Sequence, residues 1–70
     1  MMKQYKDSLG RCVCYADAFT GVVEHEYKKV KTKTTVPIGG EYTVERDSII
    51  TILKRVDTVD FQVTSYRKAA

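Results

Sequence analysis

The segment 22–36 is too long to lie straight within a domain of 70 residues. The alternation is clearest at Lys29, Lys31 and Lys33, which are separated by one valine and one threonine. Such period-two alternation is typical of a β-strand with two different faces. Fully extended, the segment would span about 50 Å at ~3.3 Å per residue. A compact chain of this length has a radius of gyration of roughly 11 Å, so the segment must bend or project as an arm.

The pattern also indicates where the bend lies. Apolar residues occupy odd positions at Val23 and Tyr27 and even positions at Val30 and Val36. A β-bulge shifts the phase in this way by inserting one residue into a strand. We therefore predict one long strand with a bulge near Lys28–Val30.

Four further segments predict strands, because each is rich in β-branched or aromatic residues and is bounded by turn residues. They are Arg11–Ala16, Glu41–Arg46, Ile49–Val56 and the alternating segment that begins at Val59. The apolar residues of 49–56 also fit helical spacing, but their β-branched character favours a strand.

The expected fold is mainly β. It is a small, strongly bent antiparallel sheet or a five-stranded barrel of SH3-like or OB-like size, with a short helix at 49–56 or 2–9 as the open alternative. We expect an N-terminal tail at 1–9, a single β-barrel-like domain at 10–66 and a C-terminal tail at 67–70.

The first hairpin has a turn signal at 17–21, which ends in a glycine suited to a positive φ. If the turn closes with Ala16 opposite Val22, then Cys12 and Cys14 share one face and His25 lies on the other. The faces of this hairpin decide which side chains can act together.

The cysteines and the histidine are the only candidates for metal or nucleophile chemistry. A structural zinc site needs four ligands, and Cys12, Cys14 and His25 supply three on opposed faces. A Cys–His dyad needs the two groups within hydrogen-bond reach, which the same register opposes. A bridge between two cysteines on one strand would be strained, so we predict reduced thiols and a cytoplasmic protein. We expect no metal, no cofactor and no enzymatic activity.

The net charge of +3 lies at the two ends of the chain. Four of the 12 basic residues and one of the nine acidic residues lie outside 10–66, which leaves eight of each within that range. A duplex-binding protein usually has a basic body, because phosphate neutralisation supplies most of its affinity. Neutrality therefore argues against a dedicated duplex binder.

We predict a small binding module that docks on another protein. Its small size would fit an accessory or inhibitor protein of a mobile element. Its expected contact residues are Tyr27, Lys29, Lys31 and Lys33. The alternative is a single-stranded nucleic-acid-binding barrel that adds Tyr15 as a stacking platform. A homodimer is possible. A membrane partner is not expected, because no apolar run approaches the length of a membrane span.

Overall fold

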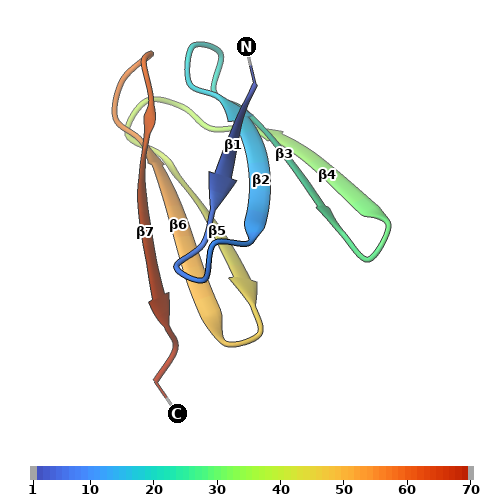
Figure 1. The fold of residues 1–70 in the computed structure, drawn as a ribbon. Helices are drawn as coiled ribbons and strands as arrows, with labels where there is room; N and C mark the ends of the chain where they lie inside the picture. Colours follow the sequence, from blue (N-terminus) through green and yellow to red (C-terminus); the bar gives the residue numbers. More distant parts are fainter. Residues whose placement is uncertain (1, 70) are drawn as a thin grey trace.

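The computed structural model describes residues 2–69, except for the side chain of Tyr27, and these residues form two antiparallel sheets (Figure 1). The first sheet has the strand order β1-β2-β3-β4 and the second has the order β5-β6-β7. The strands of the first sheet are β1 (Lys3–Lys6), β2 (Cys12–Asp17), β3 (Val22–Tyr27) and β4 (Val30–Thr35). Those of the second sheet are β5 (Glu41–Arg46), β6 (Ile49–Arg55) and β7 (Phe61–Arg67).

The prediction of a mainly β chain with antiparallel strands is confirmed, but its details need correction. Residues 2–69 form seven strands rather than five, and neither sheet closes into a barrel. The alternative helices at 49–56 and 2–9 are wrong, because these segments contain β6 and β1. Within residues 2–69, no helix is long and apolar enough to span a membrane.

The core lies between the facing sides of the two sheets. Because side chains alternate along each strand, one set from each sheet points inward. The first sheet contributes Tyr5, Cys14, Ala16 and Val23, and the second contributes Val44, Leu53 and Phe61. The rings of Tyr5 and Phe61 meet edge to face with their centroids 5.7 Å apart, which joins the two layers at one side.

Side chains close the gap between β1 and β7, which run in the same direction (Figure 1). The Tyr5 hydroxyl donates to the Asp60 carboxylate and accepts from the Phe61 N–H, and Lys3 pairs with Asp60 at 2.9 Å. Further along, the Ser8 N–H donates to the hydroxyl of Ser65. No backbone ladder joins these two strands within the described residues, so these contacts cover two edges that would otherwise be open.

A buried arginine holds the loops at one end of the molecule. Arg55 at the end of β6 donates to the carbonyl oxygens of Ala18, Phe19 and Val36 over 2.7–2.9 Å. Hydrogen bonds from a charged donor are stronger than neutral ones. One side chain thus fixes the β2–β3 turn and the β4–β5 connection against the second sheet.

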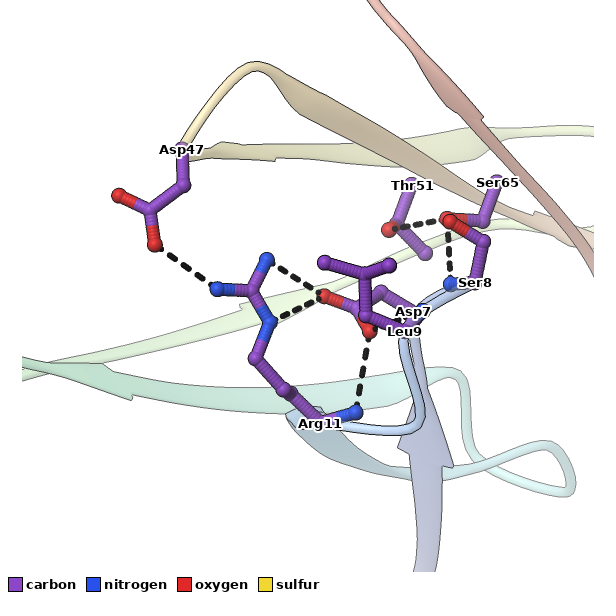
Figure 2. Close-up of polar contacts among 7 residues, drawn as sticks. All are labelled: Asp7, Ser8, Leu9, Arg11, Asp47, Thr51 and Ser65. Atoms are coloured by element: carbon purple, nitrogen blue, oxygen red, sulfur yellow. Dashed lines mark hydrogen bonds and ion pairs between the residues drawn. The ribbon is translucent and has the colours of Figure 1, made fainter.

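A second polar cluster joins the sheets at the opposite end of β6 (Figure 2). The buried Asp7 carboxylate accepts from the backbone N–H groups of Leu9 and Arg11 and from the Arg11 guanidinium. Arg11 reaches across to Asp47 in the β5–β6 turn at 2.8 Å. The turn after β1 is therefore tied to a turn of the other sheet.

Candidate functional site

The predicted bend in 22–36 is a complete reversal of the chain. Lys28 and Lys29 have φ values of 51° and 68°, and Tyr27 pairs with Val30. Two consecutive residues with positive φ between paired strands make a type I′ turn. The location predicted for the bend is thus confirmed, but the predicted bulge is wrong, because a two-residue turn shifts the apolar phase instead.

The β3–β4 hairpin projects from the body of the molecule (Figure 1). Every residue of β4 is exposed except Thr34, which is half-buried. Val30, beside the turn, leaves 65% of its surface exposed. The segment therefore both bends and forms an arm, and its far strand, β4, is the outer strand of the first sheet.

The lysines of β4 lie opposite acidic residues of β3. Lys31 pairs with Glu26 and Lys33 with Glu24 in the strand register, and the Lys31 ammonium lies 3.8 Å from the Glu26 carboxylate. Such exposed pairs contribute little to stability. The register does show that Lys31, Lys33 and the two glutamates lie on one face, since directly opposed residues project from the same side of a sheet. Lys29 lies apart from them in the turn.

The open edge of β4 carries backbone groups at these same lysines. In an antiparallel ladder, only every second residue directs its N–H and C=O toward a given neighbour. The residues flanking a type I′ turn, here Tyr27 and Val30, bond to each other. The Val36 N–H donates to the Gly21 carbonyl, so the even-numbered residues of this strand bond toward β3. It follows that Lys31, Lys33 and Thr35 direct their backbone groups away from β3.

A groove opens where β3 leaves β2. The two strands pair at three positions, from Asp17 opposite Val22 to Tyr15 opposite Glu24, and the next pair in this register, Cys14 with His25, is not formed. The resulting groove has a volume of about 500 Å³. It is lined on one side by Val13 and Tyr15 and on the other by the charged side chains of Glu24, Glu26, Lys31 and Lys33.

The predicted register of the first hairpin is wrong by one residue. Ala16 lies opposite Val23 rather than Val22, because Asp17 belongs to β2 and the connection has one residue fewer than predicted. The Asp17 carboxylate accepts from the Phe19 N–H and its carbonyl accepts from the Gly21 N–H. A shift of one residue exchanges the faces of a strand.

In the observed register Tyr15 lies on the outer face of the sheet, and His25, which is half-buried, lies on the inner face. Tyr15 is half-exposed and shares the outer face with Lys31 and Lys33, whereas His25 shares the inner face with Cys14. The structure thus brings together three of the residues predicted for nucleic-acid binding. Glu24 on β3 is paired with Tyr15 on one side and with Lys33 on the other, so it lies between these two residues across the sheet. The side chain of Tyr27 lies outside the described part, so its predicted role stays a prediction.

Cys14, which lines the groove, is not an activated thiol. Burial raises the pKa of the Cys14 thiol to about 11, so at neutral pH this sulfur is protonated and a poor nucleophile. The ring of His25 lies 6.3 Å from that of Tyr42, with its Nδ1 at 3.5 Å from the tyrosine hydroxyl. Both cysteines are free thiols, and no group of three or more metal-ligating side chains gathers among residues 2–69.

No protein-family model, curated protein or solved structure matches this chain. The site must therefore be interpreted from its own geometry. The alternation identified Lys31 and Lys33, and the length of 22–36 indicated a strand edge or an arm, but the hairpin that makes β4 an edge strand was missed. The signal for it was the phase change at Lys28–Val30, which also fits a hairpin.

Proposed function

We propose that this protein is a non-enzymatic docking module that captures an extended, acidic segment of another protein along the edge of β4. The segment would add a strand to the first sheet, with main-chain hydrogen bonds giving affinity and alternate side chains giving specificity. Carboxylates at every second position would face Lys31 and Lys33. The observation that carries this proposal is that the same β4 residues present both the lysines and the outward backbone groups.

The exposure of the hairpin supports this function. An open edge strand of six residues is a template for pairing, and lysines on such an edge discourage pairing with unselected strands. The Lys31 ammonium lies 3.8 Å from the Glu26 carboxylate, and these two side chains are 82% and 57% exposed. A carboxylate on an added strand would compete with Glu26 at little cost.

Single-stranded nucleic acid is the second candidate, because Tyr15, Lys31 and Lys33 line one groove. Stacking on Tyr15 with phosphates on the lysines would follow the common pattern for such binders. Glu24 and Glu26 oppose it, since each lies opposite one of the two lysines. This candidate requires that binding of a single-stranded oligonucleotide falls steeply as salt rises.

A synthetic peptide of alternating glutamate and valine tests the leading proposal. NMR titration should shift the amide signals of Lys31, Lys33 and Thr35 more than those of Thr32 and Thr34, which already face β3. The double variant Lys31→Glu/Lys33→Glu should lose at least a factor of about ten in affinity, or ~1.4 kcal/mol. A peptide with lysine in place of glutamate should bind that variant instead.

The matched control is the same acidic peptide with N-methyl groups on the amides that would bond to β4. It keeps every charge but cannot donate the ladder hydrogen bonds. If it binds as tightly as the unmodified peptide, strand addition is wrong and only charge attraction operates. No binding of either peptide would refute docking at this edge.

A further inference from the structure

The second sheet has an open edge that matches the edge of β4 in charge. β5 is the outer strand of its sheet, and it pairs with β6 through Arg46 opposite Ile49 at a two-residue turn. The bond from the Arg55 N–H to the Gly40 carbonyl belongs to the same ladder. By the alternation of antiparallel bonding, the residues that direct their backbone groups to the open side are Glu41, Thr43 and Glu45.

The two edges carry opposite charges on the residues that would bond. The edge of β4 presents Lys31, Lys33 and Thr35, while the edge of β5 presents Glu41, Thr43 and Glu45, and all six residues are exposed. Their side chains lie on the outer faces of their sheets. An antiparallel pair between the edges would therefore place its lysines and glutamates on one common face.

We propose that the partner of the β4 edge is the β5 edge of a second copy of this chain. This inference rests on the proposed function, since it names the acidic strand. The register sets Lys31 opposite Glu45, Lys33 opposite Thr43 and Thr35 opposite Glu41. Lys33 is then diagonal to both glutamates, a position from which long side chains still interact.

Pairing of like edges is disfavoured by the same geometry. If two β4 edges pair about a two-fold axis, every register near the middle of the strand places Lys31 or Lys33 directly opposite a lysine of the other copy. Joining two β5 edges likewise sets glutamate opposite or beside glutamate. Like charges directly opposed across strands are destabilising, so the two edges select each other.

The contact joins different surfaces of the two copies, so each copy keeps one free edge of each kind. Such assemblies grow into rings or open chains. Glu45 also pairs with Lys68 at 3.2 Å, with both side chains about half-exposed, so the second copy must displace an exposed contact. The association is therefore expected to be weak and to depend on protein concentration and on salt.

Sedimentation of charge-reversed variants tests the inference. The mean mass of the wild-type protein should rise with concentration at low salt and fall as salt is added. Lys31→Glu/Lys33→Glu has two acidic edges and Glu41→Lys/Glu45→Lys has two basic edges, so each should stay monomeric alone. An equimolar mixture should regain association, because each reversed edge then meets a complementary one. The control Lys6→Glu/Arg67→Glu changes the net charge by the same amount as Lys31→Glu/Lys33→Glu, but at positions away from both edges. It should associate like the wild type.

Amide hydrogen exchange locates the contact. On association, the amides of Lys31, Lys33 and Thr43 should exchange at least tenfold more slowly, while those of Thr32 and Thr34 should not change. Protection at the same amides that is independent of concentration would mean that β4 and β5 pair within one molecule, and it would overturn the second copy as partner.

The two proposals fail differently. If the wild type stays monomeric at every concentration but the glutamate peptide binds β4, then self-association is wrong and the docking function stands with another protein. If neither association nor peptide binding is seen, both are wrong. Association that the mixed variants do not restore would overturn the pairing of β4 with β5.

Discussion

At the scale of single residues, Gly21 lies where three segments meet. Its φ is 83°, and a Cβ at this position would lie 2.3 Å from the Val36 carbonyl oxygen and 2.5 Å from the Arg55 guanidinium. The glycine therefore lets the β2–β3 turn approach both the β4–β5 connection and the arginine that holds it. Only a residue without a side chain fits this place.

Replacement of two glycines separates the effects of conformation and crowding. Gly10 has a φ of 81° but open space around its Cβ position, so Gly10→Ala should cost about 1–2 kcal/mol from the left-handed backbone alone. Gly21→Ala should cost at least ~3 kcal/mol, because the clash adds to that strain. Urea unfolding of both variants measures the difference. Equal losses would show that Arg55 and Val36 move aside freely.

At the scale of elements, the two-residue hairpin turns after β3 and β5 lack the usual glycine. The type I′ turn favours asparagine or aspartate followed by glycine, whereas this chain uses Lys28-Lys29 after β3 and Asp47-Ser48 after β5, all four with positive φ. The absence of a glycine explains why the hairpin at 28–29 was predicted as a bulge. The strands from β2 onward lie in segments that were predicted as strands, because alternation and β-branched residues depend on the local sequence only. β1 was not predicted, since residues 3–6 show no clear period.

The lysine turn predicts a stabilising substitution. Lys29 adopts a φ of 68°, which costs a residue with a side chain roughly 1 kcal/mol, so Lys29→Gly should raise the free energy of unfolding by about 0.5–1 kcal/mol. Lys31→Gly removes the same charge from an extended strand and should lower stability instead. Thermal unfolding of the pair checks this. A loss of stability in Lys29→Gly would contradict the strain assigned to the turn.

At the scale of the whole molecule, the contacts that join the two sheets were the least predictable. Asp7, Arg11 and Asp47 are far apart in the sequence or lie in turns, and nothing in their spacing indicates that they meet (Figure 2). The register of the first hairpin failed for a related reason, since the capping role of Asp17 depends on a turn of unknown length. The lysines of the candidate site and an edge or arm of this segment were thus predictable, but the hairpin that forms the edge was not.

The contact at Asp7 predicts a loss of stability in acid. Burial alone would raise the pKa of Asp7, but the N–H groups of Arg11 and Leu9 and the Arg11 guanidinium outweigh it and hold this pKa below its usual value. The folded protein then binds this proton less readily than the unfolded chain. Its stabilisation is complete above the unfolded pKa of about 3.9 and is lost as pH falls through the folded value.

Urea unfolding between about pH 6 and pH 2 measures this effect. The free energy of unfolding of the wild type should fall more steeply with acid than that of Asp7→Asn, which cannot titrate at this position. Glu41→Gln, at an exposed position on β5, should retain the wild-type slope. A wild-type slope in Asp7→Asn would mean that other carboxylates dominate the acid response.

The side-chain seam between β1 and β7 has a consequence for how the chain is made. The Tyr5 hydroxyl and the Ser8 N–H form hydrogen bonds with Asp60, Phe61 and Ser65, more than 50 positions later in the sequence. During translation, which proceeds from the N-terminus, β1 must wait for β7 to leave the ribosome before that edge is covered. Until then the growing chain exposes an unpaired strand edge, and a holding chaperone would find its binding site there.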